Sequence, residues 1–472
     1  MNHFRYFLVA ILFLVAAVSS CKKEESISVS AEILEVDYVG DDFSITVQAS
    51  SHWTVTPNYS TAWTDMVGPG WWTPGLGQTT DTGWISCSVS EGEAGTTRVD
   101  VHVEASTANS RYGSLVFRLT ADEQKYLVVR VYQQGKLDRD MSDKLSPGMV
   151  QYLGKNIYYR DILSIKSLWL TDQPFDFSAD LVYFENLEEL RCNNSGLTAI
   201  DIPMPKLRVL WLDGCKVRRL DPDLFPALEE LFCSGNPLES LEILKAPKLK
   251  SAYCGNIRAE KELSLGPQLK YVSVTDCGLE RLDLSQASGL MELDCSYNQL
   301  KEVDVSALKV SRLDCNNNPQ LSSLKLSGDY LKVLYASSCN LSGSFTIDAK
   351  ELMLASLQNN KLEKLSFTEV TSDCSILCDN NLLTEIELPR IKGNGSVGLT
   401  CTHNLLQGLR IADSEKFAWK GSDVTLNPGK DGIFTIYVSE EPDSYWVSYL
   451  IQDWQWQGQD VTVQFVIAPS TL

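Results

Sequence analysis

The sequence predicts a mainly β protein with an N-terminal antiparallel sandwich, a long solenoid on one parallel sheet, and a small C-terminal β cap. The first observation is a motif that recurs every 20 to 23 residues between positions 168 and 411. The second is alternation of apolar and polar residues between 27 and 135, as in Phe43-x-Ile45-x-Val47. The third is the return of alternation between 412 and 472, after the repeat has ended.

The repeat aligns in two columns. The first column follows a strand leucine and contains Leu170, Cys192, Leu212, Cys233, Cys254, Val274, Cys295, Cys315, Ala336, Ser356, Cys378 and Cys401. The second column lies three positions later and contains Asn236, Asn298, Asn318, Asn359, Asn381 and Asn404, with Cys215, Cys277 and Cys339 in the same place. We expect the first column to point into the core. The asparagines are expected to turn the chain and to satisfy backbone groups with their amides.

Residues 168–411 resemble leucine-rich repeats, whose pattern L-x-x-L-x-L/C-x-x-N/C-x-L recurs in them. The resemblance implies a solenoid in which each coil buries the apolar edge of its neighbour. The segments after the asparagine are too short for full helices, so we expect extended or 3₁₀ segments on the convex side. Proteins with such repeats are generally recognition modules, and the resemblance therefore implies binding.

Residues 27–135 have the composition of a small sandwich with two tryptophan strands. The strands are Ser51-His52-Trp53-Thr54-Val55 and Gly83-Trp84-Ile85-Ser86, and the region closes with Val131-Tyr132-Gln133-Gln134-Gly135. This region resembles a BACON domain, a Bacteroidetes-associated module similar to carbohydrate-binding sandwiches. It departs from that family because an insert from Pro57 to Thr82 separates the two tryptophan strands.

The tryptophans of this region have two expected roles. Trp53 and Trp84 lie in strand contexts, so we expect both to pack in the core. Two interpretations stay open for Trp63, Trp71 and Trp72 in the insert. Their flat faces could stack on sugar rings as a glycan site, or they could pack the long loop onto the sandwich.

The first 26 residues read as an export signal and a tether. The apolar run from Phe7 to Val18 is too short to span a bilayer, which indicates a signal peptide over 1–20. Val18-Ser19-Ser20-Cys21 resembles the lipobox of bacterial lipoproteins, which implies cleavage before Cys21 and a lipid on it. The tether 21–26 begins like the tract that directs lipoproteins to the outer face in some Gram-negative bacteria. We therefore expect a lipid-anchored, surface-exposed protein of the outer membrane.

Two segments flank the repeats. Residues 136–167 are expected to form a linker and an N-terminal cap, with a short helix that begins after Ser146 at Pro147 and stops near Gly154. Residues 412–472 contain alternating stretches such as Phe434-x-Ile436-x-Val438, which predict a β cap at the C-terminal end. Such caps are needed because an end coil exposes its core.

Residue patterns typical of catalysis are absent from the sequence. The three histidines that follow the signal, His52, His102 and His403, are scattered, and no phosphate loop or nucleophile elbow occurs. Cys374 and Cys378 have metal-ligand spacing but no second pair. We expect no enzyme activity, no cofactor and no metal site. The formal net charge of -20 argues against nucleic acid or an anionic membrane surface as a partner.

Of the 13 cysteines, those of the repeats are expected to be packing residues. Ten of them occupy the two columns, where leucine, valine, alanine or asparagine stand in other repeats. Column neighbours such as Cys233 and Cys254 would lie one coil apart. Their side chains would point in parallel, whereas a disulfide needs a dihedral near 90°. We therefore expect free thiols.

The candidate site is a surface on the concave face of the sheet, because side chains that flank an inward residue point outward. The central exposed position begins with aromatic residues and continues with acids: Trp169, Arg191, Trp211, Phe232, Tyr253, Ser273, Asp294, Asp314, Tyr335, Ala355, Leu377 and Thr400. The position two residues earlier includes Glu189, Glu230, Tyr271, Glu292 and Arg312. We predict ligand binding at Trp169, Arg191, Trp211, Phe232, Tyr253 and Tyr271. The alternative is that this set only stabilises the sheet. Asp294 and Asp314 are expected to be structural.

These observations favour a non-enzymatic, monomeric cell-surface lipoprotein. It would bind a protein or glycoprotein ligand through the concave face, with the sandwich as spacer or glycan module. The alternative is a non-catalytic carbohydrate-binding subunit of a polysaccharide or mucin capture system that works through the sandwich.

Overall fold

The computed structural model describes residues 25–59, 83–106, 110–154, 156–258, 261–411, 417, 422–424, 433–438 and 462–467. The chain divides into two compact units, Met1–Ser164 and Ile165–Leu472. Cys21 and the insert tryptophans Trp63, Trp71 and Trp72 lie outside the described residues. Within the described part, no helix is long and apolar enough to cross a bilayer.

The first unit contains the predicted sandwich of two sheets. One sheet has the order β1-β3-β7-β5 and is antiparallel, with strands Ile27–Val29, Asp41–Ala49, Gly95–Val103 and Ile85–Cys87. The other has the order β2-β9-β8-β4-β6, with strands Ile33–Val36, Tyr126–Gln133, Arg111–Leu119, Trp53–Asn58 and Glu91–Gly92. In this second sheet only the edge pair β2 and β9 is parallel. The antiparallel sandwich is confirmed.

The sandwich core is built from the alternating apolar residues and the two strand tryptophans. Trp53 and Trp84 are 0% and 1% exposed, which confirms their expected place in the core. Trp53 lies 5.7 Å from the ring of Phe117. A Cβ at Gly92 would lie 2.5 Å from the Trp53 indole, so only glycine allows this packing. The Arg111 guanidinium lies 4.4 Å from the Trp84 ring.

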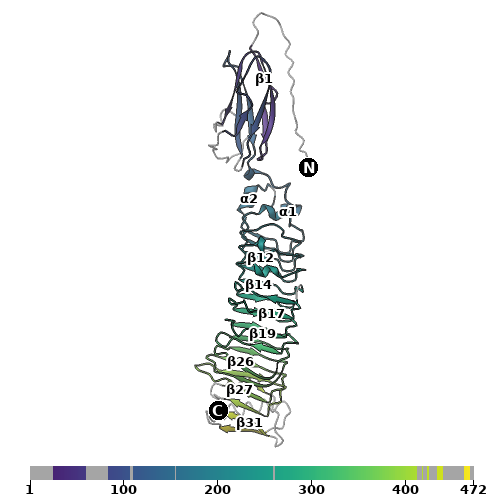
Figure 1. Ribbon diagram of the computed structural model, residues 1–472, viewed down its shortest axis with the longest axis vertical. Helices are drawn as coiled ribbons and strands as arrows, with labels where there is room; N and C mark the ends of the chain where they lie inside the picture. The colour runs from purple at the N-terminus through teal and green to yellow at the C-terminus, as the bar shows by residue number, and fades with distance from the viewer. Residues whose placement is uncertain are drawn as a thin grey trace. The chain divides into compact units, whose positions relative to one another are not determined.

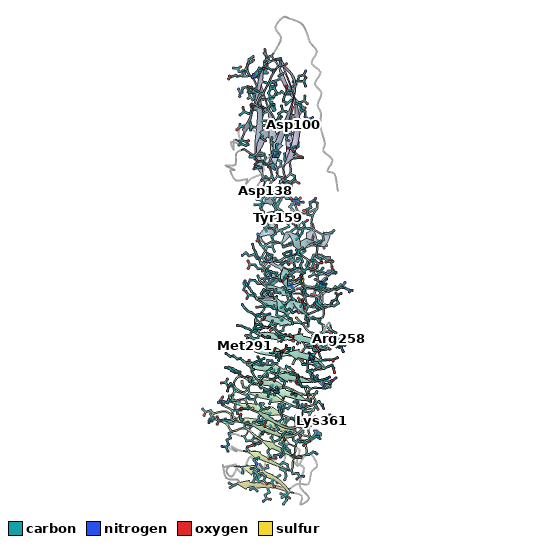
Figure 2. The ribbon with its side chains drawn as sticks, in the orientation of Figure 1. Asp100, Asp138, Tyr159, Arg258, Met291 and Lys361 are labelled. Atoms are coloured by element: carbon teal, nitrogen blue, oxygen red, sulfur yellow. The ribbon has the colours of Figure 1, made fainter. Side chains whose placement is uncertain are left out.

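The segment after the sandwich contains the 3₁₀ helix η2 (Lys136–Asp138) and the helices α1 (Pro147–Leu153) and α2 (Tyr159–Ser164). Helix α1 begins as predicted, because the Ser146 hydroxyl accepts a hydrogen bond from the Met149 amide and Gly154 follows the last turn. The start of this segment is anchored to the first unit. The buried carboxylate of Asp138 (Figure 2) accepts a hydrogen bond from the Ser110 amide and pairs with Arg160.

The second unit is a parallel β-solenoid whose coils coincide with the sequence repeat, and its strands follow one another in chain order (Figure 1). Within the described residues its long sheet has 13 strands, each paired in parallel with the next. These strands are β10 (Ser167–Trp169), β11 (Glu189–Arg191), β12 (Val209–Trp211), β13 (Glu230–Phe232), β14 (Ser251–Tyr253), β16 (Tyr271–Ser273), β18 (Glu292–Asp294), β20 (Arg312–Asp314), β22 (Val333–Tyr335), β24 (Leu354–Ser356), β26 (Cys374–Leu377), β28 (Val397–Cys401) and β30 (Asp423–Val424). The solenoid predicted from the repeat period is confirmed.

The opposite side of the solenoid changes character along the chain. The first coils carry the 3₁₀ helices η3 (Asp180–Tyr183), η4 (Pro222–Leu224) and η5 (Glu242–Lys245). Later coils carry paired strands: β15 (Glu262–Ser264) with β17 (Arg281–Asp283), and β19 (Glu302–Asp304) with β21 (Ser323–Lys325). A six-stranded sheet then contains β23 (Ser342–Ile347), β25 (Lys361–Phe367), β27 (Glu385–Glu387), β29 (Gly408–Ile411), β31 (Ile433–Val438) and β32 (Thr462–Ile467). Both expected kinds of segment, 3₁₀ and extended, are present.

The described strands of the C-terminal region extend the solenoid. Strand β30 pairs in parallel with β28, and β31 and β32 continue the second sheet in parallel. The predicted β structure is therefore present, although the repeat motif has ended. Backbone pairing and the buried side chains of Phe434, Ile436 and Val438 continue the coil where the leucine and asparagine columns are lost.

The column assignment in the coil of β24 was wrong by one residue. Strand register pairs Ala355 with the inward Leu334 and Ser356 with the outward Tyr335. Leu357, which is fully buried, therefore takes the place predicted for Ser356. Asn359 lies at the turn with a φ of 58°, and Asn360 occupies the second column. The error arose because the repeat spacing varies from 20 to 23 residues, so the sequence alone allows either Ser356 or Leu357 in the first column.

Candidate binding face

The exposed face of the 13-stranded sheet carries the residues predicted for the site. Register aligns Trp169, Arg191, Trp211, Phe232 and Tyr253 on five successive strands, β10 to β14. Adjacent strands lie about 4.8 Å apart, so these side chains form a single row across the strands. We call these five residues the aromatic ladder.

The side chains of the aromatic ladder stack on one another without a gap. The Arg191 guanidinium lies 5.4 Å from the Trp169 ring and 4.7 Å from the Trp211 ring. The rings of Trp211 and Phe232 are 4.5 Å apart at 27°, and those of Phe232 and Tyr253 are 4.6 Å apart at 9°. Trp169 is 60% exposed and Tyr253 is 36% exposed. The ladder is therefore one continuous surface of stacked planar groups.

This stacking decides which part of each ring a ligand can reach. The inner rings, Trp211 and Phe232, have both faces covered by neighbouring members of the ladder. Their edges remain toward the solvent. A sugar ring stacks on an aromatic face, whereas aliphatic and aromatic side chains also pack against edges.

Hydrogen bonds orient the central tryptophan. The Trp211 indole Nε1 donates to Asp213 Oδ2 at 2.8 Å. The other oxygen of Asp213 accepts a hydrogen bond from the Ser234 amide at 2.7 Å, in the next coil. Because Asp213 is held from two coils, the Trp211 ring is fixed in the stack before any ligand arrives.

Tyr271 lies beside the ladder. Strand register aligns it with Ser251 on one side and Glu292 on the other, in the position two residues before the central row. The structure therefore brings together all six predicted binding residues on one face, five in the stack and Tyr271 at its border.

Carboxylates surround the Tyr253 end of the ladder. Glu230 borders Phe232 on the same strand, and Glu292 aligns with Tyr271. Burial, together with the charges of Glu292 and Glu230, raises the pKa of the Tyr253 hydroxyl. The central row continues beyond Ser273 with Asp294 and Asp314, so the apolar ladder changes directly into an acidic region.

The two aspartates differ in their partners. Asp294 accepts hydrogen bonds from Thr275 Oγ1 at 3.0 Å and from Ser296 Oγ at 2.6 Å. Asp314 accepts one from the Asn316 amide. Burial and the nearby Asp294 charge raise the pKa of Asp314, against that hydrogen bond. Among the described residues, no three His, Cys, Asp or Glu side chains form a group that could hold a metal.

An alternating row of ion pairs runs beside the first strands. Lys166 pairs with Glu188 at 2.9 Å, and Glu229 pairs with both Arg208 at 3.2 Å and Lys250 at 2.9 Å. The two cations lower the pKa of Glu229 to about 2. This row was not predicted, although the sequence contains its signal, a charge of alternating sign that recurs with the repeat period.

The cysteines of the described residues are free, in agreement with the sequence-based expectation. Cys233 Sγ and Cys254 Sγ lie 3.0 Å apart in the buried column. Cys374 and Cys378 are both buried, and burial raises the pKa of Cys374 to about 12. A buried neutral thiol is a packing residue and a poor metal ligand.

The first unit has a shallow hollow of about 560 Å³ on its four-stranded sheet. His102 Nδ1 lies 2.6 Å from Asp42 Oδ1 there. Asp100, labelled in Figure 2, accepts hydrogen bonds from Ser44 Oγ at 2.6 Å and from Arg98 Nε at 2.9 Å. The hollow is lined mainly by polar side chains that already pair with each other.

No family model and no curated protein matches the chain. Among solved structures, 16 chains match. An internalin (InlF) from Listeria monocytogenes is 18% identical, with a TM-score of 0.32, over 54% of this chain and 90% of that one. The functional domain of InlJ from Listeria monocytogenes, which includes a cysteine ladder, is 16% identical with a TM-score of 0.30, over 63% and 82%. The LRIM1/APL1C complex is 20% identical with a TM-score of 0.26, over 53% and 46%. Because all three TM-scores are low, these likenesses carry no argument about this chain. Its fold is established by its own strand order and register.

Proposed function

We propose that this protein is a non-enzymatic cell-surface lipoprotein that binds a protein or glycoprotein ligand through the aromatic ladder. The observation that carries the proposal is the exposed stack from Trp169 to Tyr253 across five strands. Tryptophan, tyrosine and arginine are the residue types that dominate binding hot spots. Their stacking also fixes their rotamers in advance, so little side-chain entropy is lost on binding.

The covered ring faces favour polypeptide over sugar at this position. Trp211 and Phe232 offer edges to the solvent, and edges suit apolar side chains of a partner. A glycan would find ring faces only at the two ends of the stack. The polypeptide part of a glycoprotein ligand is therefore the part that we assign to the ladder.

The proposal predicts that Trp211→Ala weakens ligand binding strongly, with little loss of stability. Peptides from a random 12-residue display library would be selected on the purified full-length protein. Selected clones should bind Trp211→Ala with about 30-fold lower affinity, which corresponds to a hot spot of about 2 kcal/mol. The affinities of the clones would be measured by titration calorimetry.

Tyr335→Ala is the matched control for that experiment. Tyr335 lies on the same sheet face, four strands beyond Tyr253, and contacts Arg312 at 4.8 Å outside the ladder. Clones should bind this variant as tightly as the wild type. Leu210→Ala, at the fully buried middle residue of β12, should cost more stability than Trp211→Ala. Equal affinity of the clones for the wild type and Trp211→Ala would show that the ladder is architecture.

A second candidate function is glycan binding by the first unit, as in a polysaccharide or mucin capture system. The polar hollow that contains Ser44, Arg98 and Asp100 supports it, because hydroxyl, carboxylate and guanidinium groups hydrogen-bond sugars. If a glycan array on the full chain shows binding that Trp211→Ala retains, that activity lies outside the ladder. The BACON-like role of residues 27–135, as glycan module or spacer, is part of this second proposal.

Surface location through a lipid on Cys21 completes the proposal. It is supported by the apolar run from Phe7 to Val18 and by the lipobox-like residues that end at Cys21. A lipid at the N-terminus would hold both units on one side of the outer membrane.

A further inference from the structure

We infer that the partner bound on the aromatic ladder is a basic polypeptide segment, with apolar side chains on the ring edges and lysine or arginine side chains on the neighbouring carboxylates. This inference rests on the proposed function and adds the chemistry of the partner. The carboxylates are those of Glu230, Glu292, Asp294 and Asp314.

Ion pairing elsewhere on the solenoid makes these four carboxylates distinct. Surface acids on the other sides of the coils have cations within reach, as in Arg258–Asp276 at 2.8 Å, Lys261–Glu280 at 2.6 Å and Lys325–Asp304 at 2.9 Å. Within the described residues, no lysine or arginine forms an ion pair with the four carboxylates beside the ladder. Arg191 lies in the ladder itself, and Arg208 and Arg312 act on Glu230 and Asp314 at longer range. Among the described residues, however, none of the four carboxylates has a cation at ion-pair distance.

The positions of the acids match the path of one bound segment. Glu230 lies two residues from Phe232 on one strand, which is about 7 Å at 3.3 Å per residue. The ladder spans about 19 Å over five strands, and β16, β18 and β20 add about 14 Å. An extended segment of about ten residues would cover both regions, with its apolar part on the rings and its cationic part on the acids.

The electrostatic state of the face is consistent with a cationic partner. Burial, and then the charges of Glu292 and Glu230, raise the pKa of Tyr253. Burial and the repulsion from Asp294 raise the pKa of Asp314, although the charge of Arg312 lowers it in part. A bound lysine or arginine would relieve that repulsion, and the opposite arrangement, an acidic partner, would add to it. Basic segments would also be drawn by the net charge of -20.

The experiment uses the same random 12-residue display library and the purified full-length protein. Clones that require Trp211 should be enriched in lysine and arginine and depleted in aspartate and glutamate. They should bind the double variant Glu230→Gln/Glu292→Gln about 10-fold more weakly at low salt, and the difference should shrink at high salt. The matched control is Glu262→Gln/Glu280→Gln, which removes the same number of charges from acids that pair with Arg281 and Lys261 on the other side of the coils.

The outcomes separate this inference from the proposed function. Trp211-dependent clones without basic enrichment, or with unchanged affinity for Glu230→Gln/Glu292→Gln, would overturn the basic partner and leave the ladder as a binding site. Clones that bind Trp211→Ala unchanged would overturn the proposed function itself. An equal loss on the control double variant would assign the effect to net charge and also overturn the inference. A library that yields no binder would count against both.

Discussion

At the scale of single residues, Asp314 is held in a state that costs stability. Its carboxylate is partly buried next to Asp294, and its pKa is raised from 3.8 by burial and by that neighbouring charge. Because the folded-state pKa is the higher one, the folded state binds the proton more tightly than the unfolded state. The contribution of this group to the free energy of unfolding is fully present below pH 3.8, its unfolded-state pKa. It is lost as the pH rises through the folded-state pKa.

Asp314→Asn should therefore raise the melting temperature at pH 7, and the gain should vanish below about pH 3.8. Asp304→Asn is a control of opposite sign, since hydrogen bonding to Ser306 and pairing with Lys325 lower the pKa of Asp304. That variant should lower the melting temperature at pH 7. Thermal unfolding at pH 7 and pH 3 checks both, and a loss of stability in Asp314→Asn at pH 7 would contradict the assignment. A carboxylate kept at such a cost is consistent with a role in binding.

At the scale of the repeating element, the second column joins each coil to the one before it. Asn298 Nδ2 donates to the Cys295 carbonyl at 3.0 Å and to the Val274 carbonyl of the preceding coil at 2.8 Å. Its Oδ1 accepts from the amides of Cys277 and Leu279. Cysteine serves the same position in other coils, because Cys277 Sγ donates to the Cys254 carbonyl of the preceding coil at 3.0 Å. Cysteine thus keeps one of the asparagine contacts.

Asn298→Ala should lower the free energy of unfolding by about 3 kcal/mol, because several buried backbone groups would lose their partner. Asn298→Cys should lose less, by about 1 kcal/mol, because its thiol can still donate to the preceding coil. Urea unfolding of the two variants and the wild type measures the difference. Equal losses would show that cysteine occupies this column for its size alone.

At the scale of the whole molecule, the chain has two compact units with different chemistry. The first, Met1–Ser164, contains a closed sandwich core around Trp53 and Trp84. The second, Ile165–Leu472, carries the aromatic ladder and the acids beside it. In the proposed function the lipid is attached at Cys21, before the first unit in the sequence, and the solenoid carries the binding face.

The lipid anchor predicts that fatty-acid label is incorporated by the wild type and lost in Cys21→Ala, because only a cysteine at the new N-terminus can take the lipid. Cys87→Ala, which changes a half-buried thiol of the sandwich, should be labelled like the wild type. Metabolic labelling in cells followed by gel fluorography measures all three. Equal labelling of wild type and Cys21→Ala, or none in either, would rule out acylation at this residue.

The sequence by itself determined the features that recur or alternate. Leucine and cysteine recur at a spacing that allows only one inward column in the solenoid. Alternation placed Trp53 and Trp84 in the sandwich core, because the period of the apolar residues indicates which side of a strand is buried. It also placed the aromatic ladder on one face. Local signals gave the helix Pro147–Leu153 its start and end.

Only the tertiary structure decided what lies beside what. Three features depend on strand register: the one-residue shift at Ser356, the ring stacking that covers the faces of Trp211 and Phe232, and the position of Glu230 beyond ion-pair distance of the described cations. Register brings together residues 20 or more positions apart, and a spacing that varies by up to three residues leaves it open in the sequence. Hydrogen bonding between the backbones of adjacent coils fixes the register. The fixed register determines that the rings form a single stacked surface and not a row of separate rings.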